Sequence, residues 1–163
     1  MAELTTLEAK LGEVVGLAMA AQEATQKVMK LPELEEDLAQ KLERMHEEAA
    51  EAERRGTELA GQYEGKKTAI LEEARETKSK AKEMLTTYLD EQSDALDGFE
   101  FLTMAEAGEV GHWSVLETLN ERARDASIGE FVRWGLPIQQ RHFQDVQLAS
   151  TQLASEKNPE EVE

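Results

Sequence analysis

The segment TTLEAKLGEVVGLAMAAQEATQKV, residues 5–28, decides the fold class of this chain. Thr5 and Glu8 stand three residues apart, the spacing of a capping box that opens a helix by satisfying free backbone N–H groups. Hydrophobic or small residues recur at alternating intervals of three and four: Leu4, Leu7, Leu11, Val14, Ala18, Ala21, Thr25 and Val28. Because these intervals place all of them on one side of a helix, the segment is predicted to pack one face inside a helical bundle.

The same periodicity continues through the rest of the chain. Lys30, Leu31 and Pro32 form a tight connection, and Pro32 is acceptable in the first turn of the next helix, which forms an antiparallel hairpin with the first. The later predicted helices cover about residues 33–59, 67–90, 94–124 and 127–153, with candidate caps at Ser93, Asp94 and Asp97 and a second capping box from Ser127 to Glu130. The expected fold is all-α: an antiparallel four-helix bundle with an additional crossover helix, residues 67–90, between its second and third helices.

Length and composition fit one helical domain. The chain has 163 residues, of which 33% are charged and 5% aromatic, with only 10 glycines and 3 prolines. These values are typical of a bundle whose helices carry charged outer faces. We expect a single domain over residues 1–157 and a flexible acidic tail over residues 158–163.

Charge and cysteine content exclude several classes of function. The formal net charge of -17 would repel nucleic acids and anionic membrane surfaces. No stretch approaches the roughly 20 apolar residues of a membrane span, and the polar start lacks a signal-peptide pattern, so a cytoplasmic location is expected. Because the chain has no cysteine, a metal ion could be held only by oxygen and imidazole ligands, which favours iron or manganese over structural zinc.

The three histidines share a pattern that suggests a metal site. Each follows a glutamate or glutamine by three residues: Glu43 and His46, Glu109 and His112, Gln139 and His142. On a helix this spacing puts both side chains on one face about one turn apart, as two ligands of one ion must be. If the last two helices turn between Asp125 and Ala126, antiparallel packing places Glu109 level with His142 and His112 level with Gln139.

Two carboxylates also fall among core positions. Glu106 and Glu109 lie in the apolar row of the predicted helix 94–124, where a buried carboxylate is costly unless it is paired or bound to a metal. A salt bridge to Arg133 or Arg141 is the alternative to metal binding. The first helix offers no clear inward carboxylate, and its nearest candidates are Glu13, Gln22 and Glu23.

A four-helix bundle with Glu-x-x-His elements on facing helices resembles the ferritin-like superfamily. The order of the helices, the Pro-Glu-Leu turn at Pro32 to Leu34 and the glutamates and histidine of the helix 94–124 are most similar to the small bacterial YciE/YciF-like stress proteins. This resemblance implies a dinuclear iron or manganese site with the ligands Glu43, His46, Glu109 or Glu106, and His142. The chain departs from the pattern in having Gln139 where a carboxylate is usual and an extra histidine, His112, so that one ion, or none, is also open.

Two hypotheses follow. The first is a ferritin-like protein that serves oxygen or peroxide chemistry, or metal handling under stress, with the candidate metal-site residues Glu43, His46, Glu106, Glu109, His112, Gln139 and His142. The second is a metal-free helical bundle that acts as a protein-interaction or stress scaffold. A homodimer is expected, because Tyr88, Phe101 and Val132 lie off the main apolar rows and could cover a partner.

Overall fold

Residues 2–163, the part of the chain that the computed structural model describes, form five α-helices and no β-strand. The helices are α1 (Thr6–Met29), α2 (Glu36–Ala60), α3 (Lys67–Tyr88), α4 (Ala95–Ala123) and α5 (Ala126–Ser155). The all-α prediction is confirmed. Within these residues, no helix combines the length and the hydrophobicity that a bilayer crossing needs.

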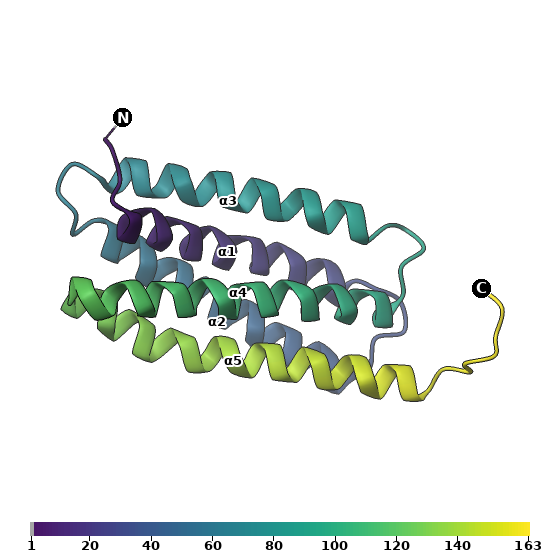
Figure 1. Cartoon of the computed structure of the whole chain (residues 1–163). Coiled ribbons are helices and arrows are strands. Elements are labelled where there is room, and N and C mark those ends of the chain that lie inside the picture. Colours follow the sequence, from purple (N-terminus) through teal and green to yellow (C-terminus); the bar gives the residue numbers. More distant parts are fainter. Residues whose placement is uncertain (1) are drawn as a thin grey trace.

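Each helix runs antiparallel to the one before it (Figure 1). α1 packs against α2, α3 and α4, while α5 packs against α4 and α2. The helices α1, α2, α5 and α4 therefore surround a common interior. α3 lies along another side of α1 and leads from the end of α2 back along the bundle to the start of α4 (Figure 1).

Side-chain caps fix the starts of α1 and α4. Thr5 and Glu8 form the predicted capping box of α1, in which the Thr5 N–H donates to Glu8 Oε2 at 2.8 Å. Burial alone would raise the pKa of Glu8, but the Thr5 N–H and the Lys66 ammonium, 2.9 Å away, outweigh it and lower the pKa. At the start of α4 the predicted caps Asp94 and Asp97 form an equivalent box.

Asp125 caps α5 and links two connections of the bundle. The predicted capping box of Ser127 and Glu130 is wrong, because α5 begins earlier and Asp125 Oδ1 accepts the backbone N–H groups of Ser127 and Ile128. The other carboxylate oxygen of Asp125 accepts the Tyr63 hydroxyl at 2.7 Å. This hydrogen bond ties the α2–α3 connection to the α4–α5 turn.

We predict that Tyr63→Phe lowers the free energy of unfolding by about 1 to 2 kcal/mol, because it removes a hydrogen bond to a carboxylate and keeps the ring. Chemical denaturation measures the change. Tyr88→Phe is the matched control, since Tyr88 is 59% exposed, and it should change stability by less than about 0.5 kcal/mol. Equal losses in the two variants would contradict the linking role of Tyr63.

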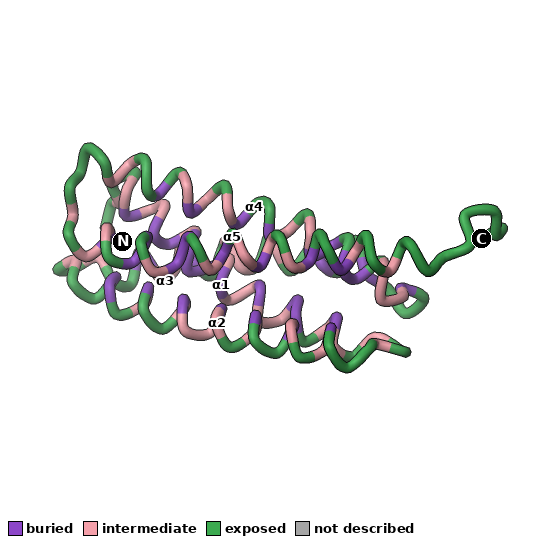
Figure 2. The backbone as a smooth tube through the Cα atoms, turned by 90° about the horizontal axis from the view of Figure 1, so that it is seen from below, coloured by how far each residue is buried: buried purple, intermediate pink, exposed green. Residues whose placement is uncertain are grey.

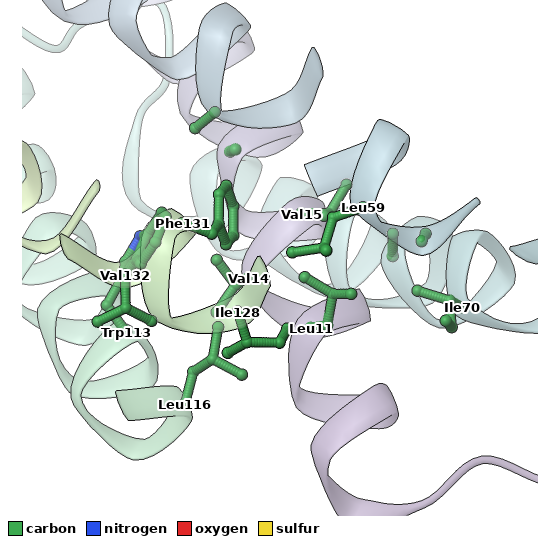
Figure 3. Close-up of a cluster of buried hydrophobic side chains, with 14 of the residues drawn as sticks. Leu11, Val14, Val15, Leu59, Ile70, Trp113, Leu116, Ile128, Phe131 and Val132 are labelled. Atoms are coloured by element: carbon green, nitrogen blue, oxygen red, sulfur yellow. The ribbon is translucent and has the colours of Figure 1, made fainter. Parts of the chain in front are cut away.

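The interior contains two hydrophobic clusters. The first lies at the end of the bundle where α1 begins, and its labelled members are Leu11, Val14, Val15, Leu59, Ile70, Trp113, Leu116, Ile128, Phe131 and Val132 (Figure 3). The second includes Val28, Leu38, Leu42, Met45, Phe99, Leu102 and Val146. Buried positions gather on the sides of the helices that face one another, with exposed positions outside (Figure 2). Each large side chain buried in this way contributes roughly 1.5 to 3 kcal/mol relative to exposure, so the clusters stabilise both ends of the bundle.

Two of the three apolar residues expected to cover a partner belong to these clusters instead. Val132 lies in the first cluster and Phe101 in the second. The prediction that they lie outside the core is wrong, because the inward arcs of α4 and α5 are wider than a single row of positions. Tyr88 is exposed, and the homodimer itself stays a prediction.

Two glycines of α1 bring α3 very close. An ideal Cβ on Gly12 would lie 2.7 Å from the Ile70 carbonyl oxygen, and one on Gly16 would lie 2.3 Å from the Ala74 carbonyl oxygen. Gly12 and Gly16 are four residues apart and thus share one face of α1. Since no side chain fits at either position, the two backbones approach each other directly.

Candidate metal centre

Glu106 and Glu109 lie between the two hydrophobic clusters. On α4 they stand between Leu102, which belongs to the second cluster, and Trp113, which belongs to the first. Glu106 is 1% exposed and Glu109 is 6% exposed. The apolar row of α4 thus places two carboxyl groups in the middle of the bundle.

α5 places Gln139 and His142 opposite Glu106. The Gln139 amide donates a hydrogen bond to Glu106 Oε2, and His142 Nδ1 lies 3.9 Å from the same oxygen. Both α5 side chains are buried. A carboxyl, an amide and an imidazole therefore meet at the interface of α4 and α5.

The structure differs from the prediction in which α4 carboxyl stands beside His142. The prediction placed Glu109 level with His142, whereas the carboxyl next to His142 belongs to Glu106. Arg124 ends α4 with a left-handed backbone, φ 53°. This conformation turns the chain from α4 into α5.

The carboxylate of Glu48 on α2, which was not among the predicted ligands, joins this group. Glu48 Oε1 lies 3.2 Å from His142 Nε2, and Glu48 also accepts hydrogen bonds from Arg141. Arg141, one of the two predicted alternative partners of the α4 carboxylates, thus forms its ion pair with α2. One signal was available, because Glu48 follows the buried Met45 by three residues and so borders the inward face of α2.

Burial changes the protonation of these groups. It raises the pKa of Glu106 to about 7, against a smaller lowering by the amide that donates to it. Burial, followed by repulsion from Glu106, holds the pKa of Glu109 well above its ordinary value. Burial also lowers the pKa of His142, although Glu48 acts in the opposite direction. Burial alone would raise the pKa of Glu48, but the hydrogen bonds from the arginine and histidine beside it outweigh burial and lower the pKa.

Glu109 faces open space rather than a polar partner. Glu109 forms no hydrogen bond or ion pair within residues 2–163. Every fully enclosed side-chain nitrogen or oxygen atom in these residues has a hydrogen-bond partner. The oxygens of Glu109 are therefore not fully enclosed and border accessible space. Glu109 lines a cavity of about 10 Å³ together with Trp113, Gln139 and His142. This volume suits a single water molecule or ion. A second, larger pocket also reaches Glu109 from the side of α1 and α3.

The predicted pair on α2, Glu43 and His46, lies outside the group. Glu43 is exposed. His46 faces α1, where its Nδ1 N–H donates to the Gln22 carbonyl oxygen at 3.1 Å. The three-residue spacing holds, but the structure does not bring this pair to the buried carboxyls.

His112 also points away, towards α1. Its Nδ1 lies 3.2 Å from Glu13 Oε2 and 3.3 Å from Lys10 Nζ. Glu13, one of the three candidate ligands of the first helix, thus pairs with a predicted ligand at the surface and not inside the bundle. The other two candidates are engaged elsewhere, Gln22 with Glu53 and Glu23 with Lys78.

The side chains that meet between α2, α4 and α5 include possible metal ligands but do not form a complete ligand set. Across residues 2–163, no three histidine, aspartate or glutamate side chains stand close enough together to hold a metal ion as they are placed. The carboxyl and imidazole donors that do meet are of the type that iron and manganese accept. No family model, curated protein or solved structure matches the chain, so its function has to be inferred from these residues and their geometry.

Proposed function

We propose that the bundle binds one divalent metal ion, iron or manganese, between α4 and α5, with Glu106, Glu109 and His142 as ligands. One observation carries the proposal: two neighbouring carboxyl groups are buried without a lysine or arginine partner among residues 2–163. Burying carboxylates is unfavourable unless an opposite charge compensates them. A divalent cation supplies that charge in the smallest volume.

The donor atoms of His142 and Glu106 fit such an ion. Glu48 lies 3.2 Å from Nε2 of His142, which favours a proton on Nε2 and a free lone pair on Nδ1. Nδ1 is the nitrogen that faces Glu106, at 3.9 Å, within the roughly 4.2 Å that two ligand bonds of about 2.1 Å can span. Glu48 and Gln139 are then positioning residues, which orient the imidazole and the Glu106 carboxyl.

Binding also requires Glu109 to turn towards the ion, because the side chains do not yet form a group of three around one point. Glu109 has no hydrogen bond to break. The ion would displace protons that the raised pKa values of Glu106 and Glu109 retain near neutral pH. Metal affinity should therefore rise with pH.

We further propose that the chain is a ferritin-like protein, and three features support this. α1, α2, α4 and α5 surround one interior, α3 lies beside them, and the donors come from separate helices. A bound iron or manganese ion would supply chemistry with dioxygen or peroxide, or would be the cargo of metal handling under stress. One ion suits the residues better than two, since Gln139 is uncharged and Glu43 is exposed.

We also propose that the protein forms a homodimer and is located in the cytoplasm.

A metal-free scaffold is the second candidate, and one observation favours it. Glu48, His142, Glu106 and Gln139 already form a connected polar network from α2 to α4. Such a network can fix the register of packed helices without any ligand. In that case, chelators and metal ions should both leave the melting temperature unchanged.

A comparison of two histidine variants tests the metal proposal. We expect Mn²⁺ at about 100 times its dissociation constant to raise the melting temperature of the wild type by roughly 5 to 10 °C over protein in chelator. His142→Gln should weaken Mn²⁺ binding at least about a hundredfold. His112→Gln, the matched control on α4, should bind Mn²⁺ like the wild type. Equal weakening in both variants, or no effect of Mn²⁺ on the wild type, would contradict the proposed ligands.

A further inference from the structure

A pocket of about 250 Å³ lies between α1, α3 and α4. Small side chains of α1, among them Ala20 and Ala24, form its floor, and Leu85 of α3 and Ala105 of α4 contribute to its walls. α3 and α4 both pack on α1, and the space between them is left open above these alanines. The volume exceeds the roughly 150 Å³ that accommodates a benzene molecule in a protein interior. The pocket is therefore large enough for a small organic molecule.

The pocket changes from apolar to acidic along α4. At its apolar end, Ala24, Leu85 and Leu102 belong to one hydrophobic cluster. One and two turns further along α4, Glu106 and Glu109 line the other end. A ligand that matches this polarity has an apolar body and one polar group.

The acidic end favours a positively charged group over a neutral or negative one. Glu109 is buried and has no hydrogen-bond or ion-pair partner within residues 2–163. Lys82, the cation on the pocket lining, stands at the rim on α3 and lies 3.8 Å from Glu23 Oε2. A ligand carboxylate would oppose the ionisation of Glu106 and Glu109 and would be repelled by a chain of net charge -17. An ammonium group would favour the ionised form of these two groups and would be attracted by the net charge.

We propose that this pocket binds a primary aliphatic amine, with its ammonium group against Glu106 and Glu109 and its hydrocarbon chain between α1 and Leu85. Scaling from benzene, the volume admits roughly ten non-hydrogen atoms, which is about the size of octylamine. The proposal goes beyond metal binding and does not depend on it. Because an ammonium group and Mn²⁺ would use the same carboxyls, the two ligands should compete.

Three eight-carbon probes test the polarity of the site. Isothermal titration of the metal-free protein in chelator should show that n-octylamine binds with one-to-one stoichiometry and at least about tenfold more tightly than 1-octanol. Sodium octanoate should not bind. Octanoate binding as tight as octylamine binding, or no saturable binding of octylamine, would overturn the proposal.

Two variants separate this inference from the metal proposal. Ala105→Leu adds bulk to the apolar wall without changing the net charge, so it should weaken octylamine at least about tenfold and leave Mn²⁺ binding intact. The double variant Glu106→Gln with Glu109→Gln should remove the preference for octylamine over 1-octanol. Unchanged octylamine binding in Ala105→Leu would show non-specific attraction to the acidic surface and overturn the pocket assignment. If the wild type bound octylamine as expected but did not bind Mn²⁺, the metal proposal would be contradicted and the amine proposal would be supported.

Discussion

Replacing the two buried glutamates of α4 together, Glu106→Gln and Glu109→Gln, should make the metal-free protein more stable at pH 8. Burial raises the pKa of Glu106 from 4.5 to about 7 in the folded protein, so the folded state holds its proton more tightly than the unfolded chain does. The resulting stabilisation is complete below about pH 4.5 and is lost as the pH rises to about 7, at roughly 1.4 kcal/mol for each pH unit. The wild type should therefore lose about 3 kcal/mol over this range, and the raised pKa of Glu109 acts in the same direction.

Glutamine keeps the shape and hydrogen-bonding capacity of the side chain but does not ionise, so the double variant should not show this loss. Urea denaturation in chelator between pH 5 and pH 8 measures the difference. Glu117→Gln, at an exposed position of the same helix, is the control and should follow the wild type within about 0.5 kcal/mol. A double variant less stable than the wild type at pH 8 would show that the carboxyls stabilise the fold. The expected gain would instead show that the chain retains them for a purpose other than stability.

The second large effect is expected at the contact of α1 with α3. A Cβ on Gly16 would lie 2.3 Å from the Ala74 carbonyl oxygen and 2.8 Å from Thr77 Cβ. Because a backbone atom blocks the space, Gly16→Ala must push α3 away from α1. Overpacking of this kind costs roughly 1 to 3 kcal/mol, more than the gain of up to about 1 kcal/mol that alanine brings to a helix interior.

Gly111→Ala is the matched control, since the same change on α4 meets nothing within 4 Å. It should stabilise the protein by up to about 1 kcal/mol, whereas Gly16→Ala should destabilise it. Hydrogen exchange should also show that Gly16→Ala lowers amide protection mainly in α3, because this helix packs chiefly on α1. Stabilisation by both substitutions would contradict the close approach of the two helices.

Sequence periodicity predicted the helices and the burial of two acidic residues, because both depend on which side of a helix a residue occupies. Leu11, Val14 and Val28 of the predicted row are buried, and so are Glu106 and Glu109, which follow the row of α4. The alternation of spacings is a local property. It needs no knowledge of which helices become neighbours.

Periodicity does not specify which neighbouring helix each inward side chain faces. Glu109 and His112 are three residues apart on α4, yet Glu109 lines the interior cavity and His112 contacts α1. On α2, His46 faces α1 while Glu48, two residues later, faces α5. When a helix packs against two others, different parts of its buried face contact different neighbours. Two residues that are two or three positions apart can therefore face different helices.

Periodicity also did not predict the helix against which α3 packs. The apolar positions of residues 67–90 predicted a helix but not its partner. The Gly-x-x-x-Gly spacing of Gly12 and Gly16 was the one signal of a close helix contact, and glycines within a helical pattern can equally mark a bend or the end of the helix. The contact becomes evident only where the Ile70 and Ala74 carbonyl oxygens leave no room for a side chain.

The most direct test of the proposed metal site is an anomalous-scattering crystal structure of the protein grown with Mn²⁺ and without chelator. We expect one strong manganese peak inside the bundle, within about 2.3 Å of a Glu106 oxygen and of His142 Nδ1, with Glu109 turned towards it. Manganese found only at exposed carboxylates, with Glu106 still bonded to Gln139 and no density between α4 and α5, would contradict the site.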